Sequence, residues 1–433
     1  MKKRHYKWYS ATYRLNARID RKLTMAGKVV FICAFALIFF GLNTRVSMLF
    51  VVFAVALALL ITDGLSLMFK SFDFGFERFL PECAAKGSEV RYSVLLRRKN
   101  GGKDFGNIFY SEVPAEPFPT LEAFLATKEP GEEKRNAFDR KMGYYRWKWL
   151  ISRNCGGNFG EFPVFGKKID GGVVFNASFL PERRGKIGFG GAYIFQKGIF
   201  GLLKKGKIVE NPGSFLVLPE IREPFEIPDT EGENLNEKNE KTRETSETGS
   251  GFELKSVRDF VPGDSLRNIH WKSSAKSGQL RTKEFYKEVD SGSLMFIDNF
   301  FEERYSENFE KILSAAASML NALQKEENLP QLLFVGRELS EIPDSSGKSL
   351  GRALSRLALA ENDPVNKLEN SLDSLIENFQ SASTVMFFTS KYDKSRHDVL
   401  MKLAGSGAAV LVFYAGEAES AGAAAFREIK IDF

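Results

Sequence analysis

The segment from residue 258 to residue 275 holds most of the residues that could do chemistry. It combines ionisable, turn-forming and aromatic side chains, namely Arg258, Asp259, Pro262, Gly263, Asp264, Arg267, His270, Trp271 and Lys272. His270 could act as a general base, but a hydrolase set with Asp264 and Ser265 needs a spatial arrangement that sequence proximity does not supply. A hydrogen-bonded structural histidine is therefore the simpler interpretation. A hydrolase that uses His270 and Asp264 is the alternative.

The same segment contains a predicted turn. Pro262, Gly263 and Asp264 are a strong turn signal. Arg258 and Arg267 could form bidentate pairs with carboxylates nearby, and such pairs would fix an irregular loop against a sheet. The mixture of acidic and basic side chains argues against a nucleic-acid site, although a basic and aromatic cluster is present. We therefore predict an interaction segment rather than a catalytic centre.

Metal and disulfide chemistry have little support from residue spacing. The three histidines, His5, His270 and His397, are scattered, and the three cysteines form no Cys-x-x-Cys pair, so zinc binding is not predicted. Such sparse cysteine usage is typical of a reducing compartment. A bridge between Cys83 and Cys155 stays open.

The elements that must hold these residues begin with an apolar block. Val29 to Leu42 is apolar except for Gly41, and a second uncharged run extends from Val46 to Thr62. One helix through both would be about 50 Å long, against a hydrocarbon core of about 30 Å, and would bury Arg45. We therefore predict a transmembrane helical hairpin over residues 29–69. A cleaved signal peptide is disfavoured because the second run follows at once.

Charge predicts the orientation of this hairpin. Within residues 1–28 the one acid is Asp20, against the basic residues Lys2, Lys3, Arg4, Lys7, Arg14, Arg18, Arg21, Lys22 and Lys28. Basic flanks stay in the cytoplasm, so we expect a two-pass protein of the cytoplasmic (inner) membrane with both termini cytoplasmic. The remainder of the chain is close to neutral, which argues against a nucleic-acid partner.

Beyond the apolar block, residues 74–225 are predicted to be a β-rich sandwich or barrel. Alternating stretches such as Glu89 to Leu96 and Tyr144 to Ile151 are separated by Gly, Pro and Asn turns. Residues 229–250 are polar and predict an exposed linker, and residues 251–289 form the signature segment.

Residues 290–433 predict an α/β domain. Apolar strands are expected at 292–297, 331–335, 383–389 and 408–414, with helical stretches at 309–323, 349–359, 368–379 and 397–403, and an edge strand at 428–433. Short apolar strands that alternate with helices are typical of a doubly wound, mostly parallel sheet.

The signature segment resembles that of domain-of-unknown-function family number 58. The family pattern is Arg-x-Tyr-x-Pro-Gly-Asp-x-x-Arg-x-Ile-His-Trp-Lys-x-Ser-Ala, and the matching residues are Arg258, Phe260, Pro262, Gly263, Asp264, Arg267, Ile269, His270, Trp271, Lys272, Ser274 and Ala275. Upstream, Arg184-Gly185 and the run from Gly198 to Leu202 also resemble the family, with Gly198-Ile199 in place of Asp-Pro.

The resemblance implies an architecture and partners. Members of the family begin with a transmembrane pair and end in a von Willebrand factor A-like domain, which here would be residues 290–433. They are associated with AAA+ ATPases of the MoxR type and with other von Willebrand A-like proteins. We therefore expect a membrane-anchored interaction or assembly factor, without a cofactor, rather than an enzyme.

The resemblance also raises one metal candidate. Von Willebrand A domains often bind Mg²⁺ through Asp-x-Ser-x-Ser after the first strand. Asp298 stands in the first position, but Phe300 and Glu302 occupy the serine positions, so Glu302 or Asp393 would have to substitute. A strand-end turn residue is the simpler interpretation of Asp298.

Overall fold

The computed structural model describes most of the chain, in two compact units. The described residues are 2–41, 47–70, 72–98, 106–169, 171–222, 245–246, 254–261, 268–286, 293–301, 305–325, 329–330, 332–336, 338–341, 347–363, 368, 384–405, 409–416 and 426–431. The N-terminal unit comprises residues 1–220, 303–307 and 354–361, and the C-terminal unit comprises 221–302, 308–353 and 362–433.

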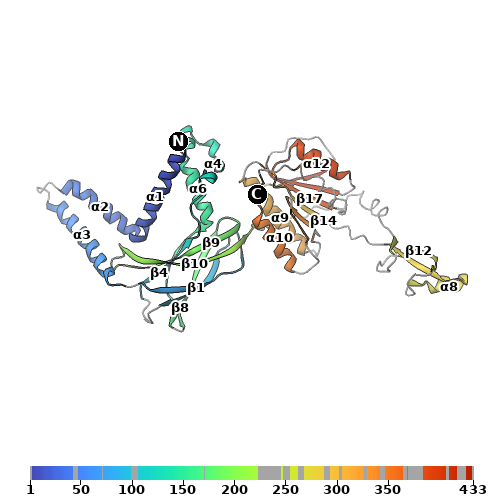
Figure 1. Cartoon of the computed structure of the whole chain (residues 1–433), viewed down its shortest axis with the longest axis horizontal. Coiled ribbons are helices and arrows are strands. Elements are labelled where there is room, and N and C mark those ends of the chain that lie inside the picture. The colour runs from blue at the N-terminus through green and yellow to red at the C-terminus, as the bar shows by residue number, and fades with distance from the viewer. Residues whose placement is uncertain are drawn as a thin grey trace. The chain divides into compact units, whose positions relative to one another are not determined.

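Three helices open the N-terminal unit. They are α1 (Lys2–Lys22), α2 (Met25–Gly41) and α3 (Ser47–Met68). Among the described helices, Met48–Met68 is long and apolar enough to cross a membrane, and Met25–Ile38 is a shorter apolar helix. Figure 1 shows α2 and α3 extending together away from the strands. The predicted turn at 43–45 lies outside the described residues.

The strands of the N-terminal unit form two sheets over one core. Their orders are β1-β3-β8-β5, with β7 beside β8, and β2-β10-β9-β4-β6. The strands are β1 (Phe74–Phe79), β2 (Cys83–Ala85), β3 (Val90–Arg98), β4 (Ile108–Pro114), β5 (Gly157–Asn158), β6 (Glu161–Pro163), β7 (Lys167–Ile169), β8 (Gly172–Pro181), β9 (Gly185–Lys197) and β10 (Lys204–Leu218). Alternate residues of both sheets, such as Leu96, Phe175 and Ile194, share the core. The prediction of a strand-rich region is confirmed.

The strand prediction for Tyr144 to Ile151 was wrong. These residues lie in α6 (Tyr144–Cys155), preceded by α4 (Leu121–Ala126), a 3-10 turn (Glu132–Lys134) and α5 (Ala137–Met142). Short aromatic runs fit either period. Gly143 and Gly156, both in the left-handed conformation, mark the start and the end of this helix. Its buried face packs on Phe124 and on Tyr9 of α1.

The C-terminal unit contains a six-stranded sheet in the order β16-β15-β14-β17-β18-β19. The strands are β14 (Ser293–Ile297), β15 (Leu332–Val335), β16 (Glu338–Glu341), β17 (Thr384–Thr389), β18 (Ala409–Tyr414) and β19 (Arg427–Lys430). All neighbours are parallel except β15 and β16. The expected α/β sheet is therefore present, and the antiparallel strand β16 is an addition to it.

Helices cover both faces of this sheet. These helices are α9 (Glu307–Lys325) and α12 (Lys394–Ala404). A further helix, α10 (Gly347–Leu359), has residues in both units. Figure 1 shows α9 and α12 on opposite sides of β14 and β17. Phe296 and Phe387 share a core with Val399 and Leu400 of α12. The neighbouring residues along each strand point to the other face. The predicted helix at 368–379 lies outside the described residues except Leu368.

The signature segment forms a small sheet of its own. Its order is β11-β13-β12, from β11 (Thr245–Ser246), β12 (Leu254–Asp259) and β13 (Arg281–Tyr286), with the short helix α8 (Trp271–Ser277) between β12 and β13. All pairs are antiparallel. Of the predicted linker at 229–250, only Thr245 and Ser246 lie within the described residues.

Candidate functional site

His270 is the N-terminal cap of α8. Its Nδ1 atom accepts the backbone N–H of Ser273 at 3.2 Å and lies 2.7 Å from the Ser273 hydroxyl. The backbone N–H of His270 donates to the Arg281 carbonyl oxygen at 2.8 Å. A side chain that accepts from the third helical residue satisfies a donor that the helix leaves unpaired. The predicted structural role of His270 therefore has a definite geometry.

Ser274 continues this network from the helix to β13. Its hydroxyl donates to the His270 carbonyl oxygen at 3.1 Å and accepts the Arg281 N–H at 2.9 Å. Ile269, which is buried, forms a β-bridge with Thr282. These contacts tie the start of α8 to β13, so this part of the signature segment folds as one unit. The hydrolase alternative stays a prediction, because Asp264 lies outside the described residues.

The arginines of the signature use the backbone as well as carboxylates. Arg258 donates to the carbonyl oxygen of Asp259 at 3.1 Å. The Asp259 carboxylate lies 3.4 Å from Arg281, and both side chains are substantially exposed. An exposed pair of this kind contributes little to stability. Pro262, Gly263, Asp264 and Arg267 of the predicted interaction set lie outside the described residues.

Three apolar side chains of the signature segment face solvent. Trp271 is 68% exposed, Val261 55% and Leu280 46%. Lys272 is also exposed, next to Trp271. Tryptophan is the residue most enriched among the anchors of protein interfaces. A small sheet whose backbone is fixed by His270 and Ser274 therefore presents an exposed tryptophan beside a cation.

Asp298 follows β14 and is fully buried. Its backbone N–H donates to the Phe388 carbonyl oxygen at 2.8 Å, which ties it to β17. Its Oδ1 atom accepts the N–H of Phe300 at 3.1 Å, and its Oδ2 atom accepts the Thr389 hydroxyl at 2.9 Å. These contacts form the strand-end turn that the simpler interpretation of Asp298 predicts.

The guanidinium of Arg396, on α12, supplies the positive charge that the buried Asp298 carboxylate needs. It donates from Nε to Asp298 Oδ2 at 2.7 Å and from a terminal nitrogen to the Phe300 carbonyl oxygen at 2.8 Å. The other terminal nitrogen lies 3.1 Å from Asp393. Burial alone would raise the pKa of Asp393, but hydrogen bonds from Arg396 outweigh it and hold the pKa of that carboxyl below its ordinary value.

This donor set does not fit Mg²⁺. A divalent cation needs several oxygen ligands that are not already paired with a positive charge, and both carboxylates here are bound by Arg396. Within the described ranges, no three His, Cys, Asp or Glu side chains are grouped so that they could hold a metal ion. Glu302 lies outside the described residues. The three cysteines are free thiols.

Sequence reasoning missed the role of Asp63, an acid near the end of α3. Its carboxylate is fully buried and accepts three backbone N–H groups, from Phe200 at 2.7 Å, Leu202 at 2.9 Å and Leu203 at 2.7 Å. The turn between β9 and β10 that resembles the family pattern is thus held by the apolar helix. A carboxylate in an otherwise apolar run was the available signal, but its partner lies 137 residues or more away in sequence.

Thr24, at the start of α2, holds the same turn from the other side. Its hydroxyl donates to the Gly201 carbonyl oxygen at 2.7 Å, and its N–H donates to the Leu202 carbonyl oxygen at 2.9 Å. Gly27 packs so close that a Cβ atom there would overlap the Leu202 carbonyl. α3, through Asp63, and the start of α2, through Thr24, therefore both bind the turn between β9 and β10.

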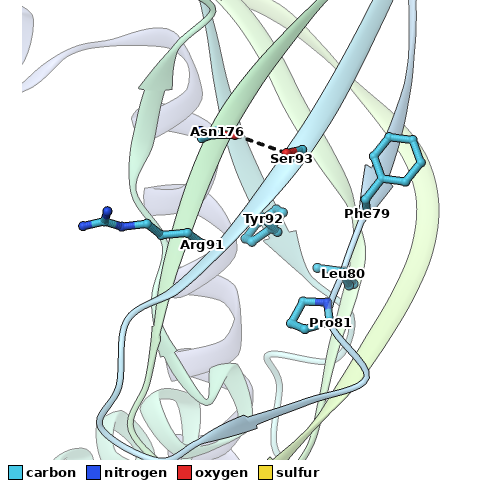
Figure 2. A pocket seen from close by; sticks show the side chains of 7 residues that line it. All are labelled: Phe79, Leu80, Pro81, Arg91, Tyr92, Ser93 and Asn176. Atoms are coloured by element: carbon cyan, nitrogen blue, oxygen red, sulfur yellow. Dashed lines mark hydrogen bonds between the residues drawn. The ribbon is translucent and has the colours of Figure 1, made fainter.

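A shallow pocket of about 490 Å³ lies on the β domain, lined by Phe79, Leu80, Pro81, Arg91, Tyr92, Ser93 and Asn176. Figure 2 shows Arg91 pointing away from Phe79, Leu80 and Pro81, while Ser93 hydrogen-bonds Asn176 at 3.2 Å. The Tyr92 hydroxyl donates to the buried Glu112. No convergent set of polar groups is aimed into this pocket from the described lining, so it does not resemble a ligand site.

Comparison with known proteins places the signature in a family. The family described as "Protein of unknown function DUF58" matches residues 256–419. A relative from Bacillus subtilis (strain 168), "Uncharacterized protein YeaD", is 32% identical over 114 residues. That match covers 26% of this chain and 28% of the relative, so this chain aligns with well under two thirds of that protein's length.

Proposed function

We propose that this chain is a membrane-anchored protein-interaction factor whose signature segment binds a protein partner. The observation that carries the proposal is the exposed Trp271, presented on α8 by the His270 cap. Exposed apolar groups that are rimmed by polar side chains mark sites of protein interaction, and a large aromatic side chain is a frequent anchor of such sites. Val261 and Leu280 of the same segment are also exposed.

The proposed placement is a two-pass protein of the cytoplasmic membrane. The basic residues of α1 and the apolar α2 and α3 support a hairpin with both termini in the cytoplasm. The parallel sheet of the C-terminal unit supports a von Willebrand A-like domain. In this proposal the Asp298 and Arg396 pair stands where such a domain would hold its metal.

The proposed partner is an AAA+ ATPase of the MoxR type, with other von Willebrand A-like proteins as further members of the assembly. This partner class is implied by the family resemblance of the signature residues. A cytoplasmic location would give the signature segment access to such an ATPase. The exposed Lys272 beside Trp271 favours a partner surface that carries acidic side chains around an apolar pocket.

The test uses the full-length chain, purified in a mild detergent, and a purified AAA+ ATPase of the MoxR type. Binding of the ATPase to the immobilised chain is measured by surface plasmon resonance. Trp271→Ala is expected to weaken binding by about tenfold or more, because buried tryptophan anchors are worth about 2 kcal/mol or more.

The matched control is Phe165→Ala, which removes an aromatic side chain that is 88% exposed in the β domain. It should leave ATPase binding unchanged. If the ATPase does not bind the wild-type chain at low salt, the proposed partner is wrong. If both variants bind as the wild type does, the signature segment is not the interaction site.

A further inference from the structure

A groove of about 1070 Å³ lies within the N-terminal unit, where α1, the end of α3 and strands β9 and β10 meet. Its basic lining residues are Arg18, Arg21, Lys22, Lys204, Lys205 and Lys207. Among the described residues that line it, none is acidic. The groove is therefore a concentration of positive charge at the end of the helix that is long and apolar enough to cross a membrane.

Two of these cations already have partners. The Lys205 ammonium donates to the carbonyl oxygens of Leu67 and Met68, at 3.0 Å and 2.9 Å, and so caps the end of α3. Lys204 pairs with Glu161. The carboxylate of Glu161 is shared with Lys197 at 3.1 Å, so it is neutralised by two cations.

The remaining four cations are Arg18, Arg21, Lys22 and Lys207, and all are exposed. Within the described part of the chain, no carboxylate forms an ion pair with any of them. Four cations around one groove repel one another, and an anion placed between them would relieve that repulsion. The groove is thus complementary to a negatively charged group.

The groove also has an apolar side. Leu15, Ile19, Leu67 and Met68 contribute to its lining, and Met68 at the end of α3 is 57% exposed. Inorganic phosphate or a soluble sugar phosphate would gain nothing from these side chains. An amphiphile, with an anionic head and apolar chains, would contact both parts of the lining.

The walls of the groove are held in place by hydrogen bonds. The Tyr193 hydroxyl of β9 donates to the carbonyl oxygen of Arg21 at 2.6 Å. Leu23 forms a β-bridge with Leu203. Asp63 and Thr24 fix the turn between β9 and β10, as described above. The cations are therefore carried on a preformed frame, which lowers the entropy lost on binding.

We propose that this groove binds the headgroup of an anionic phospholipid from the membrane that α3 enters. The lipid phosphate lies among Arg18, Arg21, Lys22 and Lys207, and the acyl chains follow the apolar surface of α3. Basic pockets beside membrane helices recognise anionic headgroups in this way. The bound lipid fixes α1 at the membrane surface, beside the β domain.

The test uses the delipidated full-length chain in a neutral detergent, titrated with phosphatidylglycerol or phosphatidylcholine and observed by native mass spectrometry. Phosphatidylglycerol should bind at least about tenfold more tightly than phosphatidylcholine, since each basic residue near an anionic lipid is worth about 1 kcal/mol. The variant Arg18→Gln, Arg21→Gln, Lys22→Gln, Lys207→Gln should lose this preference.

The matched control is Lys2→Gln, Lys3→Gln, Arg4→Gln, Lys7→Gln, which removes the same number of charges at the other end of α1. It should keep the preference for phosphatidylglycerol. Equal binding of the two lipids by the wild type, or an equal loss in both variants, would overturn the proposal. Competition by inorganic phosphate as strong as by phosphatidylglycerol would assign the groove to a soluble anion instead. The wild-type comparison decides the matter if the groove variant does not fold.

Discussion

The Nε atom of Arg396 lies 2.7 Å from the Oδ2 atom of Asp298, and the carboxylate is fully buried. The two residues are 98 positions apart, and they bring the first turn of α12 to the carboxyl end of β14. A buried carboxylate is tolerated only when a partner compensates its charge. In this chain the partner is a guanidinium supplied by the protein itself.

Removal of that guanidinium should destabilise the protein. Arg396→Ala leaves the Asp298 carboxylate buried without its cation, and breaking one side of a buried pair costs about 3–5 kcal/mol. The melting transition of the full-length chain, followed by calorimetry, should therefore shift down by several degrees. Addition of EDTA or of millimolar Mg²⁺ should leave the wild-type transition in place.

The matched control is the double change Asp298→Asn with Arg396→Met, which removes both charges. It should be more stable than Arg396→Ala alone, because the fully buried carboxylate at position 298 is no longer present without its cation. A rise in the melting temperature of wild type with Mg²⁺ that is absent in Asp298→Asn would show instead that the site takes a metal ion.

The role of His270 can be separated from catalysis by two substitutions. His270→Asn keeps a side chain that caps helices well, whereas His270→Ala loses the cap at a cost of about 1 kcal/mol. His270→Asn should therefore keep the wild-type melting temperature and ATPase binding, whereas His270→Ala should lower the melting temperature. A hydrolytic activity that both substitutions abolish at unchanged stability would favour the enzyme hypothesis.

The close contact of Gly27 with the turn between β9 and β10 predicts that a larger residue at position 27 lowers the stability of the fold. A methyl group there overlaps the Leu202 carbonyl oxygen, which is backbone and cannot move aside cheaply. Gly27→Ala should therefore lower the melting temperature and expose the turn to protease. Gly351→Ala is the control, because nothing lies within 4 Å of its added Cβ atom. It should be neutral or stabilising by about 0.5–1 kcal/mol, as expected for a helical glycine.

The lipid groove should loosen in alkaline solution. Burial raises the pKa of Tyr193 to about 12 from its ordinary 10.0. The unfolded chain then loses this proton first, so the stabilisation is complete below pH 10 and is lost as the pH rises through 12. Calorimetry of wild type between pH 9 and pH 12 should show a steeper fall than Tyr193→Phe, which has no hydroxyl to titrate. Equal slopes would mean that the Tyr193 hydroxyl is not buried between α1 and β9 in the folded chain.

Some features follow from the sequence because they depend on local pattern. The apolar runs around Phe35 and Val55, the strand-rich middle region and the alternating strands and helices after residue 290 are each determined by hydrophobic periodicity over short windows. The signature could likewise be identified from residue types alone. The strand prediction at Tyr144 to Ile151 failed because a short aromatic run has no clear period, and packing against Tyr9 and Phe124 decided for a helix.

Contacts between distant residues were decided by the tertiary structure. Sequence marked Asp298 as a candidate ligand, but only the fold brings Arg396 to it. It marked His270 as a possible base, but the cap on α8 depends on where the strand β13 lies. Asp63 and the lipid groove join residues of α1, α3 and β10, and no local rule specifies which backbone groups or cations such long loops bring together. Hydrophobic periodicity depends on neighbouring residues, whereas charge compensation in the low-dielectric interior requires contacts between residues about a hundred positions apart, as for Asp298 and Arg396.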